Sequence, residues 1–347
     1  MRTAPARGHV ALLLPWSILL LDRVPVVGEL VGILLPVFGL AAACAAVWLH
    51  LRWRRSTGPG GLPSTVTVAA VTLALACVAG TVLPWTPLDL QPPRGQTVEI
   101  VSANIRSAND GDAATDELLA TGADVLVTVE TPLLAIEGLQ AVYPYTSTAL
   151  PRQLGGVNVW SRFPLQRLPD LDGLQEARSV VVRVEAPSPF VLVAVHLPRP
   201  WPTSRGLVGD APHPTRYDAD LLTQRRLAEA LAAGLEGVEG PVVVAGDTNL
   251  SDRGYGYRQL TGVVDDVMRS TWALPTSTKP LFLPLRLRID HLMVGGDWCG
   301  RSRGRIPLPG SDHDAISATI GPCPSTPHRL TGSPAACAVP ACRPTPT

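Results

Sequence analysis

Asp312 and His313 stand side by side in the stretch Gly310-Ser-Asp-His-Asp314, just before an apolar run from Ala315 to Ile320. A carboxylate can bind a metal ion, and an imidazole can transfer a proton near neutral pH. The pair alone is weak evidence, because an Asp-His pair occurs by chance on many protein surfaces. It gains weight only if other segments supply further ligands and proton carriers.

Further polar residues lie at or just beyond the C-terminal end of a predicted strand, namely Asn104, Glu130, His196, Asp247 and Asn249. Asp290 and His291 interrupt an apolar strand. Polar side chains at strand ends point into loops, where sites are built on a rigid scaffold. Singly, each has a structural explanation, such as an Asx-turn at Asp247 or a helix cap at Glu130. Together these explanations require every strand to end in an unrelated polar turn, which favours one convergent site.

The residue types define the chemistry of such a site. Asn, Glu and Asp oxygens without a cysteine cluster suit a hard cation such as Mg²⁺ or Mn²⁺. His196 and His313 could donate to a phosphate or move a proton, and Asp290 could orient an imidazolium. This combination predicts metal-dependent hydrolysis of a phosphate ester.

With these residues in view, the chain resembles the endonuclease/exonuclease/phosphatase family. The matching stretches lie in family order between about Val98 and Ile320. They are Ser102-Ala-Asn-Ile-Arg106, Val129-Glu130, Val159-Trp-Ser-Arg-Phe-Pro164, Ala194-Val-His-Leu197, Ala245-Gly-Asp-Thr-Asn249, Arg288-Ile-Asp-His291 and Gly310-Ser-Asp-His313. The resemblance implies an α/β fold, a four-layer α/β sandwich of two packed mixed sheets flanked by helices. Here N-terminal transmembrane helices would precede it.

The resemblance also implies a metal site. Glu130 would be the main metal carboxylate, with Asn104 and Asp312 close to the Mg²⁺ or Mn²⁺ ion. Asp247 would position or activate the attacking water. The residue before Glu130 is Val129, where the family most often has Gln, and this departure removes no ligand.

The resemblance assigns the remaining polar residues to the phosphate and to proton transfer. Asn249 and His196 would hold the phosphate. His313, paired with Asp290, would be the general acid or base, or a phosphate contact. Thr248 at the centre of the Asp-x-Asn motif departs from the usual residue without removing a proton carrier.

The elements that must position these residues follow from the apolar pattern. Strands are predicted at residues 98–103, 124–129, 157–160, 179–185, 190–195, 241–245, 287–294 and 315–320, and helices at 113–121 and 217–235. Strands outnumber helices, and helices separate some of them. That order predicts a layered α/β domain with strands packed as two sheets.

The N-terminal part of the chain is apolar. Residues 30–51 and 64–85 contain no Asp, Glu, Lys or Arg, and each run is long enough to cross a bilayer core of about 30 Å. Residues 10–21 form a shorter run that could be a third span, an interfacial segment or a signal-peptide core. Arg52, Arg54 and Arg55 between the long runs predict a cytoplasmic loop, and hence a multi-pass cell-membrane protein with an extracytoplasmic catalytic domain. A hydrophobic hairpin dipping into one leaflet is the alternative.

These patterns divide the chain into four predicted parts. They are residues 1–85 as a membrane region with two or three transmembrane helices, 86–97 as a Pro-rich linker, 98–321 as the catalytic domain and 322–347 as a disordered tail. Cys299, Cys323, Cys337 and Cys342 lie in the predicted outer part and allow three pairings, among which the sequence does not choose.

Composition bears on the substrate. Residues 98–321 hold 26 Asp and Glu against 20 Lys and Arg, whereas nucleic-acid binders usually carry a basic face. A nuclease remains possible, because Arg199, Arg205, Arg216, Arg225 and Arg226 could cluster. The alternatives are a phosphodiesterase or phosphatase acting on lipid head groups or small esters, with Trp201 and Pro202 as a lip at the bilayer, and a catalytically silent binding module. The expected partners are a phosphate-ester substrate and the lipid bilayer; no protein partner is implied.

Overall fold

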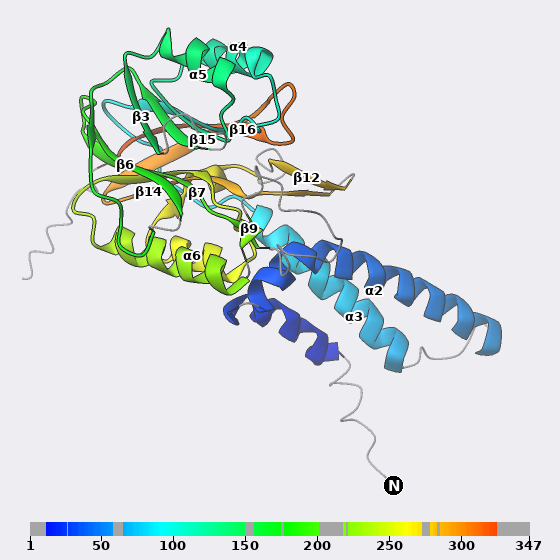
Figure 1. Ribbon diagram of the computed structural model, residues 1–347. Helices are drawn as coiled ribbons and strands as arrows, with labels where there is room; N and C mark the ends of the chain where they lie inside the picture. Colours follow the sequence, from blue (N-terminus) through cyan, green and yellow to red (C-terminus); the bar gives the residue numbers. More distant parts are fainter. Residues whose placement is uncertain are drawn as a thin grey trace, which may run out of the picture.

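The structure, a computed structural model, describes residues 12–25, 27–57, 65–149, 156–174, 177–200, 218–219, 221–272, 278–282 and 285–324. The expectations for Trp201, Pro202, Arg205, Arg216, Cys337 and Cys342, and for a tail from residue 325 onward, lie outside these residues. Figure 1 shows two stacked sheets between helices, with a separate group of N-terminal helices extending from one side.

Each sheet has six strands and mixes parallel with antiparallel pairs. The first has the order β15-β16-β1-β2-β4-β3 and consists of β15 (Trp298–Pro307), β16 (Asp314–Pro322), β1 (Val98–Asn104), β2 (Val125–Val129), β4 (Val157–Ser161) and β3 (Tyr145–Ala149). The second has the order β11-β14-β10-β7-β6-β5 and consists of β11 (Asp265–Asp266), β14 (Asp290–Gly295), β10 (Val242–Asp247), β7 (Phe190–His196), β6 (Arg178–Val184) and β5 (Leu165–Arg167). In these sheets β1 pairs with β2, and β7 with β10, in parallel, while the other neighbours are antiparallel.

The central strands are apolar on both sides because both of their faces are covered. Successive side chains of a strand point to opposite faces. In β7, Phe190 and Leu192 belong to the core between the sheets, whereas Val191 and Val193 belong to the core under the helices. Strand β1 divides in the same way, so the continuous apolar runs of the sequence mark strands in the middle of a layered structure.

Helices cover the outer face of each sheet. Helices α4 (Asp112–Ala120) and α5 (Leu133–Gln140) pack on the first sheet, and α6 (Leu221–Glu236) and α7 (Tyr255–Thr261) pack on the second. The predicted four-layer α/β sandwich is therefore confirmed. The remaining short elements are η2 (Leu83–Trp85), η3 (Val267–Ser270) and two small strand pairs, β8 (Arg199–Pro200) with β9 (Asp218–Ala219) and β12 (Lys279–Phe282) with β13 (Leu285–Leu287).

The structure differs from the predicted elements in several places. The strand predicted at residues 287–294 is two strands, β13 and β14, because the chain leaves the small β12–β13 sheet before it joins β10. Strand β15 was not predicted. It is an edge strand in which Arg301, Arg303 and Arg305 alternate with other residues, and such a polar sequence is also typical of a loop. Helix α5 was missed because it is only eight residues long.

Two N-terminal helices are long and apolar enough to cross a membrane, α2 (Val27–Thr57) and α3 (Thr65–Val82). Within their most apolar windows only 39% and 22% of the residues are buried in the protein, so most of this apolar surface faces outward. The segment before them, η1 (Leu14–Arg23), is a 3₁₀ helix packed against both. At about 2 Å per residue its ten residues span roughly 20 Å, less than a bilayer core of about 30 Å.

The chain between the helices and the sheets lies against the sandwich. Leu88 N donates to Arg269 O at 2.7 Å, and Arg94 N donates to Pro322 O at 2.9 Å. Strand β16 runs to Pro322, and a disulfide joins Cys323 to Cys299, the second residue of β15. The division of the chain into domains at residues 85, 97 and 321 stays a prediction.

Candidate active site

The candidate site lies along one rim of the two sheets. Because β7 and β10 are parallel, their carboxyl ends meet at the same edge, and the register sets His196 opposite Asp247. Strand β14 runs the other way, so its first residue, Asp290, lies opposite Asp247 on the other side. In the first sheet, β1 ends at Asn104 beside the end of β2, which Glu130 follows.

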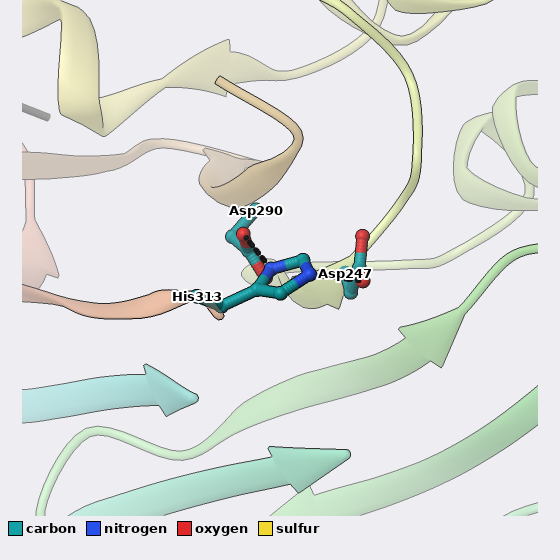
Figure 2. A group of neighbouring side chains, drawn as sticks. All are labelled: Asp247, Asp290 and His313. Atoms are coloured by element: carbon teal, nitrogen blue, oxygen red, sulfur yellow. Dashed lines mark hydrogen bonds and ion pairs between the residues drawn. The ribbon is translucent and has the colours of Figure 1, made fainter. Parts of the chain in front are cut away.

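His313 lies between two buried carboxylates (Figure 2). Its Nδ1 is 2.8 Å from Oδ2 of Asp290, and its Nε2 is 3.8 Å from Oδ2 of Asp247. Ligand atoms of the three residues lie within 4.8 Å of one another. The Thr278 hydroxyl donates to the same Asp290 oxygen, while Asp290 Oδ1 is buried without a hydrogen-bond partner among the described residues. A buried carboxylate oxygen in that state can receive a metal ion or another donor.

The charges of this group shift one another's proton affinities. Burial by itself would lower the pKa of His313, but the carboxylates of Asp290 and Asp247 outweigh burial and raise the pKa to about 9. For Asp247, burial and then the nearby Asp290 carboxylate raise the pKa to about 7. At neutral pH, His313 is therefore protonated, and Asp247 can take up or release a proton.

Asp247 is held by hydrogen bonds on both oxygens. Asn104 donates through Nδ2 to Oδ2 at 3.0 Å, which connects the two sheets, and the Asn249 backbone N donates to Oδ1 at 3.0 Å. Asn249 has a left-handed backbone with φ of 51°, and its Nδ2 donates to Leu197 O at 2.8 Å. A non-glycine residue in this region is strained, and such strain clusters at functional sites.

Glu130 and His196 form the second half of the rim. Glu130 also has a positive φ, 50°, and its side chain is 24% exposed. Among the described residues its carboxylate has only distant partners: His196 Nε2 at 3.7 Å, and the Ser107 backbone N and hydroxyl at 3.5 Å. For His196, burial, followed by the positive charges of Arg178, His313 and Arg199, lowers the pKa to about 3, so the ring is neutral at pH 7.

A buried polar network fixes the turn that carries Glu130. The Thr131 hydroxyl donates to the Thr128 hydroxyl at 2.8 Å, and the Asn158 amide donates to Thr131 at 2.9 Å. Trp160 Nε1 donates to Thr128 at 2.9 Å. These bonds join the end of β2 to β4, so the backbone on both sides of Glu130 is fixed from within the first sheet.

Asp312 lies at the edge of this rim. Its carboxylate is paired with the ammonium group of Lys279, and its side chain is 50% exposed. Burial would raise the pKa of Asp312, but the hydrogen bond and charge of Lys279 lower it overall. The expected role of Asp312 near a metal ion stays a prediction. Its neighbour Ser311 donates to Asn104 O at 2.7 Å and accepts from His313 N at 3.0 Å, which sets the turn before β16.

Sequence reasoning missed Thr278 and Lys279, which approach the rim from the β12–β13 side. The one available signal was that Lys279 is the only lysine in the chain. His291 belongs elsewhere, although it follows Asp290 in sequence. Its ring contacts Asp266 Oδ2 through Nδ1 at 3.3 Å and Leu250 O through Nε2 at 3.0 Å, in a fully buried cluster with Arg288.

The chain is similar to several solved structures. No curated protein matches the chain. Among solved structures, it is similar to a humanized D. rerio TDP2 with 14 mutations (14% identity, 65% of this chain and 99% of that chain, TM-score 0.49). It is also similar to an endonuclease/exonuclease/phosphatase from Beutenbergia cavernae (18% identity, 66% of this chain and 72% of that chain, TM-score 0.47). A third similar structure is sphingomyelinase C from Streptomyces griseocarneus (15% identity, 65% of this chain and 99% of that chain, TM-score 0.44).

The family comparison covers the whole candidate site. The family model matches residues 101–313, from β1 to the residue before β16, and so includes every residue of the candidate site. Proteins of this family are generally hydrolytic phosphoesterases that depend on divalent metal ions. The chain belongs to the Endonuclease/Exonuclease/phosphatase family.

Proposed function

We propose that the protein is a membrane-anchored, divalent-metal-dependent phosphoesterase that hydrolyses phosphodiester bonds. The observation that carries this proposal is the position of His313 between Asp290 and Asp247, on the rim that also holds Glu130 and His196. His313 supplies a protonated imidazole, and Asp247 supplies a carboxylate that titrates near neutral pH. Glu130 supplies a carboxylate that can bind a metal ion. Together these groups supply what hydrolysis of a phosphate ester requires.

The residues fit a hard cation. The carboxylate of Glu130 is mostly buried and has no donor nearer than 3.5 Å among the described residues. Its oxygens are therefore available to coordinate a metal ion. Glu130 would hold Mg²⁺ or Mn²⁺, with Asn104 and Asp312 close by. When bound, such an ion stabilises negative charge on the phosphoryl oxygens and on the leaving group.

The remaining roles follow from protonation. Asp247, with a pKa raised to about 7, would orient the attacking water and accept its proton. His313, held protonated by Asp290, would donate to a phosphoryl or leaving-group oxygen. His196 is neutral and would hold the phosphate together with Asn249 by hydrogen bonding rather than by charge.

Membrane anchoring is supported by α2 and α3. Arg52, Arg54 and Arg55 lie near the C-terminal end of α2. Glu29, which contacts the domain, lies near the N-terminal end of the same helix. By the positive-inside rule the C-terminal end of α2 is cytoplasmic, and the catalytic domain is extracytoplasmic. The Cys299–Cys323 disulfide supports the same side, because disulfides persist in oxidising compartments.

A lipid-derived phosphodiester is a second candidate substrate beside nucleic acid. Ile33 of α2 packs with Leu287 and Ile289, and Ile289 directly precedes Asp290. The start of a candidate membrane helix thus lies within a few residues of the site. The net acidic charge of residues 98–321 also fits a lipid better than a polynucleotide.

A substrate panel on the full chain in uncharged detergent tests this function. The substrates are plasmid DNA, RNA, sphingomyelin and bis-p-nitrophenyl phosphate, each with Mg²⁺ or with EDTA. We expect hydrolysis of at least one substrate with Mg²⁺ and none with EDTA. Glu130→Gln should lower the rate and raise the Mg²⁺ concentration needed for half-maximal activity, whereas the matched surface variant Glu137→Gln should behave as the native chain. Absence of activity on every substrate would support a catalytically silent module instead.

A further inference from the structure

A cavity of about 570 Å³ lies where the N-terminal helices meet the sandwich, apart from the candidate active site. Its apolar walls come from η1, α2, the end of α3 and η2, and include Leu19, Leu35 and Leu83. Its polar wall comes from α7 and the segments beside it. The volume is in the range of pockets that bind small ligands.

Three arginines line the polar wall. They are Arg253, Arg258 and Arg269, and the one acidic residue among the described residues of the lining is Asp252. The Asp252 carboxylate is fully buried and faces two guanidinium groups, Arg253 at 3.4 Å and Arg288 at 3.5 Å. Its charge is therefore offset inside the protein, and the guanidinium group of Arg269 remains as a charged donor on this wall.

Arg269 shows that this wall has donor capacity left. Its guanidinium donates to Thr86 O at 3.1 Å, while its Nε is buried without a hydrogen-bond partner among the described residues. A buried donor in that state is costly unless a ligand satisfies it. An anionic oxygen acceptor fits both this donor and the positive charge of the wall.

The junction that forms the cavity is closely packed. The Glu29 carboxylate of α2 accepts from the Gly256 backbone N, and a Cβ on Gly32 would come within 2.5 Å of Ser251 Oγ and 2.9 Å of Gly254 N. Ile33 lies in one apolar cluster with residues of the sandwich. The helices thus meet the sandwich at one defined place.

The cavity also lies at the depth of lipid phosphates. The uncharged stretch of α2 runs from Leu30 to Leu51, and 21 steps of about 1.5 Å give roughly 32 Å, close to a bilayer core. The cavity contacts α2 at Val31 and Gly32, within one turn of Leu30. Its apolar part therefore faces acyl chains, and its arginines lie at the level of head groups.

We propose that this cavity binds the phosphate of one anionic phospholipid from the leaflet that the sandwich faces. The arginines hold the phosphate, and the apolar wall contacts the glycerol and the first part of an acyl chain. An anionic lipid is favoured over a zwitterionic one because the acid of the described lining, Asp252, is buried between the guanidinium groups of Arg253 and Arg288 and does not reach a choline. The proposal rests on α2 and α3 spanning a membrane and does not depend on catalytic activity.

Native mass spectrometry of the full chain in uncharged detergent tests it. We expect one molecule of dioleoyl phosphatidylglycerol to be retained at concentrations where dioleoyl phosphatidylcholine is not. The double variant Arg258→Gln, Arg269→Gln should weaken phosphatidylglycerol binding roughly 25-fold, about fivefold for each arginine. Arg258→Gln alone, at an exposed position of α7, should weaken phosphatidylglycerol binding about fivefold. This single variant replaces the double variant in the test if the double variant fails to fold.

The control removes the same charge from another surface. Arg167 and Arg183 are exposed arginines paired with Asp170 and Glu185, so Arg167→Gln, Arg183→Gln should retain the lipid as the native chain does. Equal retention of phosphatidylcholine, unchanged binding in the double variant or an equal loss in the control would overturn the proposal. Displacement of the lipid by equimolar inorganic phosphate would overturn it too, because the site would then recognise a free anion. All of these outcomes are measured as lipid retention and need no activity assay.

Discussion

His313 and Asp290 join the two sheets of the sandwich at the candidate site. His313 directly precedes β16 of the first sheet, Asp290 begins β14 of the second, and Nδ1 lies 2.8 Å from Oδ2. The Asn104–Asp247 hydrogen bond crosses between the same sheets at 3.0 Å. The packing of the two sheets therefore sets the geometry of the site, and changes in that packing should appear in the chemistry.

Removing the carboxylate behind His313 should change the pH dependence of the protein. Asp290→Asn removes the first of the two charges that raise the pKa of His313 to about 9, so that pKa should fall by roughly 1 to 3 units. Histidine-labelled NMR titration of the metal-free protein measures it directly. Asp314→Asn, which changes a carboxylate paired with Arg286 and Arg305, should leave the titration in place. An unchanged titration in Asp290→Asn would contradict the assigned pair.

The same pair should make the metal-free protein less stable in alkali. The folded pKa of His313 is about 9, above an unfolded value of about 6.5. Its stabilising contribution is therefore fully present below about pH 6.5 and is lost as the pH rises through 9. The melting temperature in EDTA should fall over this range, and it should fall less in His313→Gln. A flat or rising profile in the native chain would show that His313 is not held protonated.

The glycine before Asp247 should tolerate no side chain. Gly246 has a φ of 142°, and a Cβ there would lie 1.9 Å from the carbonyl oxygen of Val195 in the neighbouring strand β7. Gly246→Ala should separate β10 from β7 and displace Asp247 from His196, which lowers both the melting temperature and the hydrolysis rate. Gly237→Ala, where the nearest atom is at an ordinary 3.5 Å, should leave both unchanged. A fully active, equally stable Gly246→Ala chain would contradict this packing.

A buried ion pair beside the site should matter far more than an exposed one. Arg288 and Asp266 are fully buried and 3.0 Å apart, so Arg288→Met leaves a buried carboxylate without its counter-ion. The expected loss is about 3–5 kcal/mol. Arg303→Met removes an arginine that is 59% exposed and paired with Glu99, and should cost less than about 1 kcal/mol. Thermal unfolding followed by circular dichroism compares the two, and equal melting temperatures would contradict the difference.

The disulfide should stabilise the outer end of the first sheet. Cys299 and Cys323 are 24 residues apart, and closing a loop of that length contributes about 3 kcal/mol in the chain-entropy account. Cys299→Ser, Cys323→Ser should therefore melt several degrees lower. Cys44→Ser, at an exposed free cysteine of α2, is the matched control and should melt like the native chain. If the double variant melts with the native chain, the bridge does not contribute to stability.

The layers and the rim could be predicted because they depend on local patterns. Strands such as 190–196 are apolar on both faces, and polar residues such as His196 and Asp247 mark their ends. The pairing of Lys279 with Asp312 could not be predicted, because it depends on where the β12–β13 pair lies against the sandwich. Nor could the burial of Arg288, because a charged side chain next to a strand is usually read as exposed.

The most direct test of the central claim is the rate at which the full chain hydrolyses bis-p-nitrophenyl phosphate with Mg²⁺. If His313 carries a proton in a convergent site, His313→Ala should slow hydrolysis by about 100-fold or more. Asp170→Asn, at a surface residue paired with Arg167, should hydrolyse at the native rate. Hydrolysis by His313→Ala at the native rate would contradict the account.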